Sequence, residues 1–290
     1  MRALLETAAK VLDHDVSVLI LGESGSGKDH LAAALHACSP RRDQPLVAID
    51  CASIPAELFE SELFGYEKGT FTDAQQRKLG KLELAQRGTV YFDEIGALSP
   101  ALQAKLLRAL QDRRFTRLGG NQVVELDVRI VSSSAADIEA LRRDLLYRIN
   151  VVTLALPPLR ERREDIPLLA QLFLRNASRR VRTIDAEAMR MLCEHSWPGN
   201  VRELRNVIER AAVLEEGDCI TPASLPRDRF GGGEELVAAG ARAEWTLDEL
   251  ESRYIREVLR RTRDNYSRAA EILGINRKTL LEKRRKYGLE

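Results

Sequence analysis

A glycine-rich segment that joins an apolar run to a helical stretch constrains this chain more than any other feature. It reads Gly-Glu-Ser-Gly-Ser-Gly-Lys-Asp over residues 22–29, between the apolar run 16–21 and a predicted helix at 28–37. Glycines let backbone N–H groups surround a phosphate, and the helix N-terminus adds a positive dipole. A turn that binds nothing is the alternative, and the flanking strand and helix argue against it.

One position departs from the general phosphate-binding motif. Lys28 would reach the β- and γ-phosphates, but the motif then places Ser or Thr as a Mg²⁺ ligand, and this chain has Asp29. The candidate nucleotide-binding residues are Gly22, Glu23, Ser24, Gly25, Ser26, Gly27, Lys28 and Asp29.

Two adjacent acids follow the apolar run 89–92. Asp93 is the candidate Mg²⁺ ligand, directly or through water, and Glu94 is the candidate base that polarises the attacking water. The pair could instead cap the next helix, but a phosphate loop roughly 65–70 residues upstream is compatible with the same sheet. We therefore expect ATP and Mg²⁺ as cofactors.

Apolar runs alternate with helical stretches in the first half of the chain. The runs lie at 16–21, 46–49, 89–92 and 128–132. This alternation predicts a parallel sheet with helices on both faces, and beyond Pro157 the patterns are only helical. The expected domains are an α/β core at 1–156, a helical lid at 157–221, a linker at 222–245 and a last domain at 246–290.

Composition narrows the class of protein. Hydrophobic residues make up 44% of the chain, enough for a buried core, and the net charge of +1 means that nucleic-acid affinity would need a local basic patch. Four cysteines lie far apart without metal-ligand spacing, which fits a reduced, cytoplasmic compartment. No apolar stretch approaches the roughly 20 residues of a membrane span, so no membrane partner is expected.

Residues 246–290 predict an all-α helix-turn-helix domain. Thr246 and Glu249 form a capping box for a first helix that ends near Arg261, and Gly274 supplies the turn between two further helices. Candidate base contacts are Arg277, Lys278 and Thr279, and candidate phosphate contacts are Lys283, Arg284, Arg285 and Lys286. The first helix would pair two copies, with recognition helices about 34 Å apart on a palindromic site. A basic, solvated helix is the alternative.

Ordered segments of the chain resemble the NtrC family of bacterial enhancer-binding proteins, AAA+ activators of sigma-54 RNA polymerase. The resemblance rests on residues 22–29 and covers nearly the whole chain. Further matches are Glu-Ser-Glu-Leu-Phe-Gly-Tyr-Glu-Lys-Gly-Thr-Phe-Thr-Asp-Ala at 60–74, Phe-Asp-Glu-Ile-Gly at 92–96, Leu-Gln-Ala-Lys-Leu-Leu-Arg at 102–108, Leu-Pro-Pro-Leu-Arg-Glu-Arg at 156–162, Glu-Asp-Ile-Pro at 164–167 and Trp-Pro-Gly-Asn-Val-Arg-Glu-Leu at 197–204. The last helices resemble the Fis-type helix-turn-helix found at the C-terminus of this family.

The resemblance implies roles for three arginines. Arg142 and Arg148 match the arginine fingers that reach a neighbouring subunit's nucleotide, where a guanidinium stabilises the transferring phosphoryl group. Arg202 matches the lid arginine that senses the γ-phosphate. Fingers that act in trans imply a closed ring, because each site needs a neighbour. The family suggests a hexamer.

Several residues depart from the family pattern. Gly-Thr-Phe-Thr-Asp-Ala at 69–74 stands where the family carries Gly-Ala-Phe-Thr-Gly-Ala, the loop that grips sigma-54. Phe71 and Thr72 are kept as candidate sigma-54 contacts, while Thr70 and Asp73 differ. The first sensor usually reads Ala-Thr-Asn, and here residues 133–135 read Ser-Ser-Ala.

A further departure from the family pattern concerns the catalytic acids. Asp50 stands where the family often has an asparagine that pairs with the catalytic glutamate. An aspartate there would place a second negative charge near Glu94, which would raise the pKa of one of the two carboxylates. Together with the loss of the amide at Ala135, it leads us to expect slow or pH-sensitive turnover.

Two functions of different kinds follow. The first is a transcriptional activator that hydrolyses ATP in a ring, binds an upstream palindromic site on double-stranded DNA and remodels sigma-54 RNA polymerase holoenzyme to form an open complex. The second is an ATP-binding, DNA-binding regulator or repressor that is not coupled to sigma-54. A remodeller or helicase loader of another AAA+ class is disfavoured by the helix-turn-helix. No receiver or ligand-sensing domain fits before Met1, so we expect either a separate regulatory protein as a further partner or a constitutively active form.

Overall fold

A computed structural model describes residues 1–71, 74–135, 138, 140–178, 180–226, 240–241, 243–262 and 265–288. The chain divides into two compact units. The first comprises Met1–Ala177 and Trp197–Glu209, and the second comprises Ser178–Ser196 and Arg210–Glu290.

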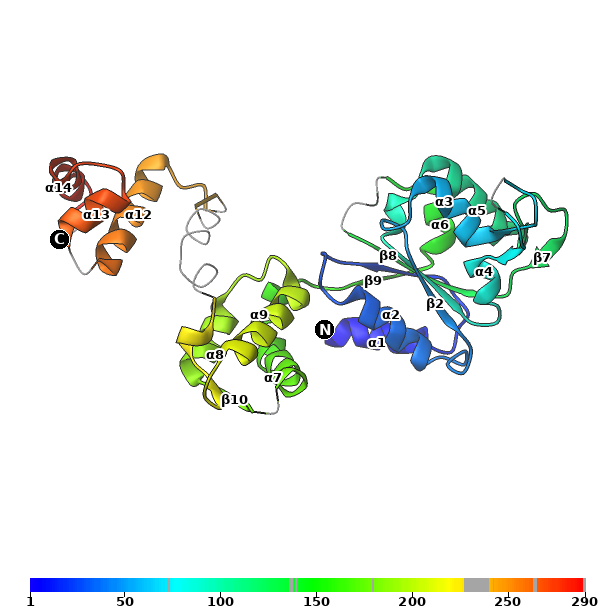
Figure 1. The fold of residues 1–290 in the computed structure, drawn as a ribbon, viewed down its shortest axis with the longest axis horizontal. Helices are drawn as coiled ribbons and strands as arrows, with labels where there is room; N and C mark the ends of the chain where they lie inside the picture. The colour runs from blue at the N-terminus through cyan, green and yellow to red at the C-terminus, as the bar shows by residue number, and fades with distance from the viewer. Residues whose placement is uncertain are drawn as a thin grey trace. The chain divides into compact units, whose positions relative to one another are not determined.

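A five-stranded parallel sheet forms the centre of the first unit, in the order β2-β5-β8-β1-β9 (Figure 1). Its strands are β1 (Val18–Leu21), β2 (Leu46–Asp50), β5 (Thr89–Asp93), β8 (Arg129–Ser134) and β9 (Val152–Ala155). The first four coincide with predicted apolar runs, whereas β9 does not. As an edge strand it pairs only with β1, and only its Leu154 is buried. The predicted parallel sheet is confirmed.

Helices cover both faces of this sheet (Figure 1). They are α1 (Arg2–Lys10), α2 (Lys28–Ala37), α3 (Ala56–Phe64), α4 (Lys81–Leu84), α5 (Pro100–Asp112) and α6 (Arg143–Ile149). The unit also contains α7 (Ile166–Ala177) and the first part of α9 (Asn200–Leu214). Alternate residues of β5 enter different cores. Val90 and Phe92 pack with α3, α4, α5 and α6, while Tyr91 packs with α1 and α2. Because the strands are parallel, their carboxyl ends bring β1, β5 and β8 together at one edge.

Two short antiparallel pairs extend from the unit. They are β3 (Gly65–Tyr66) with β4 (Lys78–Leu79), and β6 (Arg114–Thr116) with β7 (Val123–Glu125). Three turns of 3-10 helix lie at Ile95–Ala97, Leu159–Glu161 and Arg163–Asp165.

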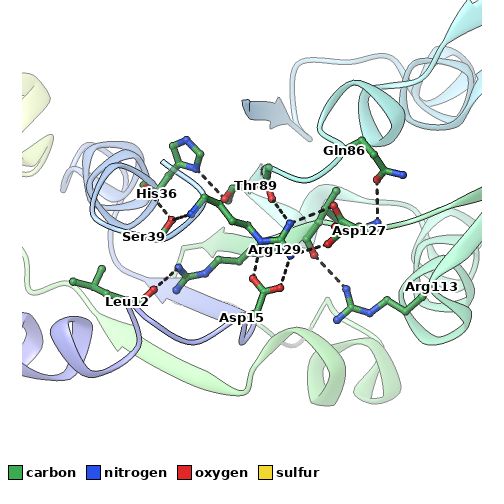
Figure 2. Close-up of polar contacts among 12 residues, drawn as sticks. Leu12, Asp15, His36, Ser39, Gln86, Thr89, Arg113, Asp127 and Arg129 are labelled. Carbon is green, nitrogen blue, oxygen red and sulfur yellow. Dashed lines mark hydrogen bonds and ion pairs between the residues drawn. The ribbon is translucent and has the colours of Figure 1, made fainter. Parts of the chain in front are cut away.

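Two arginines, Arg129 and Arg41, lie at the opposite edge of the sheet, and Figure 2 shows the contacts of Arg129. Arg129 at the start of β8 is buried and donates to the carbonyl oxygens of Val11, at 2.9 Å, and Leu12, at 3.3 Å. These oxygens end α1, where the helix dipole favours a cation. Arg41 pairs with both Asp15 and Asp127. The two guanidinium groups therefore fix α1 and the following turn against the sheet.

The second unit contains the C-terminal helices. Its elements are α8 (Ala186–Glu194), the end of α9, β10 (Thr183–Ile184) paired with β11 (Cys219–Ile220), a 3-10 turn at Pro222–Ser224, α12 (Leu247–Arg261), α13 (Tyr266–Ile272) and α14 (Arg277–Lys286). The pair β10–β11 corrects the expectation that strands stop at Pro157, because two residues are too short to produce a periodic pattern. The predicted linker falls largely on 227–239 and 242, which lie outside the described residues. The predicted domain boundaries stay predictions.

The predicted helix-turn-helix is confirmed. Ile255, Val258 and Leu259 of α12 form a buried core with residues of α13 and α14. Both hydrogen bonds of the predicted capping box at Thr246 are present. Gly274 has a φ of +64° in the turn before α14.

Candidate functional site

The phosphate loop joins β1 to α2 in a turn that needs glycine. Gly25 and Gly27 have φ values of +74° and +102°, which L side chains rarely adopt. A Cβ atom at Gly25 would also lie 2.4 Å from the carbonyl oxygen of Gly199. Lys28 is buried at the start of α2, and its Nζ donates to the Gly22 carbonyl oxygen at 2.8 Å. The loop thus has the shape and the cation that a phosphate site requires.

The two acids at the end of β5 lie beside this lysine. Glu94 Oε1 is 2.9 Å from Lys28 Nζ. Glu94 itself adopts a left-handed backbone conformation, with φ 52° and ψ 55°. Asp93 Oδ1 accepts hydrogen bonds from Ser133 Oγ at 2.5 Å and from the Tyr91 hydroxyl at 2.9 Å. The structure therefore brings the predicted lysine, metal ligand and base into one site.

The end of β8 contacts both acids. Ser133 Oγ accepts a hydrogen bond from the Glu94 N–H at 3.1 Å. The Ala135 N–H donates to Glu94 Oε2 at 2.9 Å, so the residue that lost the sensor amide still contacts the base through its backbone. Of the two serines in the sensor segment, Ser133 is the one whose hydroxyl bonds Asp93.

Asp50 is turned toward its own loop. It is the register partner of Asp93 on β5. Its Oδ1 accepts from the N–H groups of Ala52, at 3.0 Å, and Ser53, at 3.1 Å. These bonds cap the turn after β2 and give Asp50 a structural role. The predicted effect of Asp50 on turnover stays a prediction.

Glu23 connects the phosphate loop to the lid segment. Its carboxylate accepts two hydrogen bonds from the Arg160 guanidinium, at 2.7 and 2.8 Å, and one from Asn200 Nδ2, at 3.1 Å. The bidentate Arg160 contact holds the pKa of Glu23 below its ordinary value. Asn200 is fully buried and also donates to the Ser24 carbonyl oxygen at 3.1 Å. Glu23, predicted to bind nucleotide, therefore holds the loop in place. The contacts of Asn200 and Arg160 with it were not predicted from the sequence.

A cavity of about 440 Å³ opens beside the phosphate loop. Arg202 lines it, and its Nη1 lies 3.2 Å from Ser24 Oγ. Leu172 and Phe173 of α7 supply apolar walls of the kind that cover a base. Arg162 donates to the Ser26 carbonyl oxygen at 2.6 Å, so its guanidinium also fixes the loop.

The donors at this site fit a Mg²⁺ ion, which prefers oxygen ligands. Among the described residues, the Asp93 side chain accepts hydrogen bonds at Oδ1, which leaves Oδ2 for a ligand. Ser26 Oγ is buried and has no hydrogen-bond partner among the described residues. Asp29, in contrast, has a largely exposed side chain whose Oδ1 contacts His30 Nδ1 at 3.1 Å.

The two candidate arginine fingers belong to α6 and its N-cap. Arg142 is half-exposed and pairs with Asp144 at 2.7 Å. Arg148 Nη2 donates to the Leu110 carbonyl oxygen at 2.8 Å. A role in trans stays a prediction for both.

The candidate sigma-54 loop lies between β3 and β4. The Phe71 side chain is 45% exposed and its ring edge rests on Tyr66, with centroids 4.8 Å apart. The Thr70 hydroxyl bonds the carbonyl oxygens of Glu67, at 2.6 Å, and Leu118, at 3.0 Å. The hydroxyl that departs from the family pattern thus ties the loop to the β6–β7 hairpin. Thr72 and Asp73 lie outside the described residues.

The basic side chains of α14 differ in their contacts. Lys283 Nζ is 2.6 Å from Glu251, and Lys286 Nζ is 3.0 Å from Asp248, both on α12. Arg284 donates to the Tyr266 hydroxyl at 2.8 Å. Arg277, Lys278 and Arg285 are exposed. By their exposure and contacts, these three are therefore the cations of α14 most accessible to DNA. The Thr279 hydroxyl donates to Asn276 Oδ1, at the N-cap of its own helix.

Family models match the chain in three consecutive parts. The sigma-54 interaction domain matches residues 1–155, the AAA+ ATPase lid domain residues 160–239, and the bacterial regulatory protein Fis family residues 246–287. The chain belongs to the NtrC family of bacterial enhancer-binding proteins.

Curated NtrC-family relatives extend beyond this chain. It is 44% identical to the transcriptional regulatory protein ZraR of Salmonella typhimurium, over 98% of this chain and 66% of ZraR. It is 44% identical to the regulatory protein AtoC of Escherichia coli, over all of this chain and 66% of AtoC. The chain thus spans about two thirds of the length of these relatives.

Solved NtrC-family structures share the fold. NtrX from Brucella abortus, in complex with ADP, aligns with a TM-score of 0.72 at 35% identity, over 99% of this chain and 68% of NtrX. The complex of NtrX with ATP aligns with a TM-score of 0.71 at 36% identity, over 99% and 67% of the two chains. In the part of the chain that the structure covers, no helix is long and apolar enough to cross a membrane.

The exposed start of α14 leads to a prediction about sequence reading. Replacing Arg277 by alanine should reduce the preference for the cognate site by about 1–3 kcal/mol, because a bidentate base contact is lost. Replacing Arg285 by alanine should instead weaken the affinity for all DNA sequences equally. The slope of log affinity against log salt concentration should fall by about one. Fluorescence anisotropy with cognate and scrambled duplexes, at several salt concentrations, measures both effects. If Arg277→Ala weakens all duplexes equally, Arg277 contacts phosphate and not bases.

Proposed function

We propose that this chain is an ATP-hydrolysing transcriptional activator that binds an upstream palindromic DNA site and remodels sigma-54 RNA polymerase holoenzyme to drive open-complex formation. The observation that carries the proposal is the 2.9 Å ion pair between Lys28 and Glu94, because it joins the phosphate-binding cation to the candidate base. ATP as the ligand is supported by NtrX, which was solved in complex with ADP and with ATP.

The ion pair also suggests how nucleotide binding activates the base. Lys28 neutralises Glu94 while its Nζ bonds the Gly22 carbonyl oxygen. The γ-phosphate of ATP would compete for the same ammonium and leave the Glu94 carboxylate free to take a proton from water. Asp93 Oδ2 would hold Mg²⁺, which neutralises charge on the phosphates when bound.

A ring, which we propose to be a hexamer in the cytoplasm, is supported by the arginines of α6. Arg142 is half-exposed and its side-chain bonds go to Asp144, two residues away. A guanidinium held at the surface in this way is available to a neighbouring subunit. Arg148 would join it once its bond to the Leu110 carbonyl oxygen opens.

Contact with sigma-54 is assigned to the loop that carries Phe71 and Thr72. An exposed aromatic side chain at a loop tip is suited to a protein partner, because it buries a large apolar area on contact. Helix α12 carries an exposed apolar stripe, with Leu247 at 84% and Tyr254 at 44% exposure, seven residues and so about two turns apart on one face. This stripe supports pairing of two DNA-binding domains.

One observation favours the second candidate function, an ATP-binding regulator that is not coupled to sigma-54. The two hydrogen bonds of the Thr70 hydroxyl anchor the loop to the carbonyl oxygens of Glu67 and Leu118. A loop that stays anchored through the ATP cycle would not transmit force to the polymerase.

Transcription with two purified holoenzymes separates the candidates. A linear template would carry the DNA site upstream of a sigma-54 promoter or of a promoter for the housekeeping sigma factor. The proposal predicts run-off transcripts only with sigma-54 holoenzyme and only with ATP, not with a non-hydrolysable analogue. Regulation of the housekeeping promoter, with no transcript from the sigma-54 promoter, would favour the uncoupled regulator.

A further inference from the structure

Two hydroxyl groups meet at one oxygen of the candidate metal ligand. Ser133 Oγ donates to Asp93 Oδ1 at 2.5 Å, and the Tyr91 hydroxyl donates to the same oxygen at 2.9 Å. Both donors are enclosed by protein, with Tyr91 4% exposed and Ser133 fully buried. We propose that Tyr91 and Ser133 are positioning residues that turn Asp93 Oδ2 toward the metal. This inference rests on the proposed function, because it assigns a role at the ATP–Mg²⁺ site.

The strands explain why the two donors converge. Tyr91 lies two residues before Asp93 on β5, so both side chains leave the same face of the sheet. Ser133 comes from β8, the parallel neighbour of β5. The Tyr91 ring is packed in the core under α1 and α2. That packing fixes the position of the Tyr91 hydroxyl group. The Asp93 carboxylate therefore adopts the rotation that brings Oδ1 into hydrogen-bonding distance of it.

Ser133 also restrains the base. The Glu94 N–H donates to Ser133 Oγ at 3.1 Å, so one hydroxyl oxygen joins the side chain of Asp93 to the backbone of Glu94. Glu94 has a φ of 52°, a left-handed conformation that is unfavourable in a residue other than glycine. Such a conformation persists only when neighbouring contacts determine it. Ser133 supplies one of those contacts.

Residues at and just after the end of β8 contact both acids. The Ser133 hydroxyl bonds the candidate metal ligand Asp93, and the Ala135 N–H bonds the candidate base Glu94. Outer hydrogen bonds of this kind orient metal ligands, and their loss typically costs about 10–100-fold in metal affinity.

Mg²⁺ affinity, measured apart from turnover, tests the inference on the whole chain. Tyr91→Phe and Ser133→Ala each remove one hydroxyl, and Ser132→Ala is the matched control. Ser132 is the adjacent residue of β8, equally buried, and its hydroxyl has no hydrogen-bond partner among the described residues. A fluorescent ATP analogue would be bound first in EDTA and then titrated with Mg²⁺. Thermal melting would be recorded for every variant.

We expect Tyr91→Phe and Ser133→Ala each to raise the half-saturating Mg²⁺ concentration about tenfold, with Ser132→Ala unchanged. Affinity in EDTA should stay at the wild-type value, which a general loss of structure would not allow. Wild-type Mg²⁺ dependence in Tyr91→Phe, the milder variant, would overturn the inference. A wild-type chain that binds no nucleotide with or without Mg²⁺ would instead contradict the proposed function, so the two failures are distinct.

Discussion

Replacing Glu94 by glutamine is expected to lower ATP turnover by about 10²–10⁴-fold while ATP binding is retained. Glutamine keeps the shape of the side chain and can still accept the hydrogen bond from the Ala135 N–H. It cannot take a proton from the attacking water. It also removes the ion pair with Lys28, so the ammonium is free for phosphate before ATP arrives.

Single-turnover phosphate release and equilibrium binding of a fluorescent ATP analogue measure these two effects separately. Glu57→Gln serves as the control, because Glu57 is exposed in the first turn of α3. An unchanged rate of phosphate release in Glu94→Gln would exclude Glu94 as the base. Loss of ATP binding in the same variant would mean that the carboxylate holds the phosphate loop together.

Replacing Arg142 by alanine should lower ATP turnover by about 10³-fold or more. Mixing this variant with Lys28→Ala subunits should restore part of the turnover. An arginine supplied in trans acts on the nucleotide of its neighbour. In mixed rings, a subunit with Arg142→Ala keeps an intact phosphate loop. A neighbouring subunit with Lys28→Ala binds no ATP but still provides Arg142. Mixing two inactive proteins should therefore restore a fraction of the activity.

Phosphate release across a series of mixing ratios tests this prediction. Arg143→Ala is the matched control, because Arg143 is the next residue and is also exposed. It should keep wild-type turnover. Mixtures that stay inactive at every ratio, while both variants still assemble, would place Arg142 in its own subunit's site and remove the chemical reason for a ring.

The nucleotide site could be predicted from the sequence because its parts are local. The phosphate loop occupies eight consecutive residues, 22–29, and the acids Asp93 and Glu94 are adjacent at the end of one apolar run. Parallel strands then bring such segments to one edge whatever the intervening loops contain. The pattern also predicted the capping box at Thr246, which involves only neighbouring residues.

Contacts between distant segments could not be predicted in this way. Ser133 lies 40 residues from Asp93, and Asn200 lies 177 residues from Glu23. Nothing in the local pattern of either segment indicates its partner. The edge strand β9 was not among the predicted strands, although residues 151–156 are apolar apart from Thr153.

The basic face of α14 shows a further limit. By residue type, Lys283 and Lys286 are as strong candidates for phosphate contact as Arg285. In the fold their charges are paired with Glu251 and Asp248 of α12, which lie 32 and 38 residues away. Folding thus neutralises part of a basic patch that the sequence presents as uniform.

Conversion of a closed sigma-54 holoenzyme–promoter complex into a heparin-resistant open complex tests the account most directly. The template would carry the chain's DNA site, and phosphate release would be measured in the same tube. The account predicts heparin-resistant complexes with ATP and none with a non-hydrolysable analogue. Phosphate release without open complexes would contradict it, because the ATPase would then run without coupling to the polymerase.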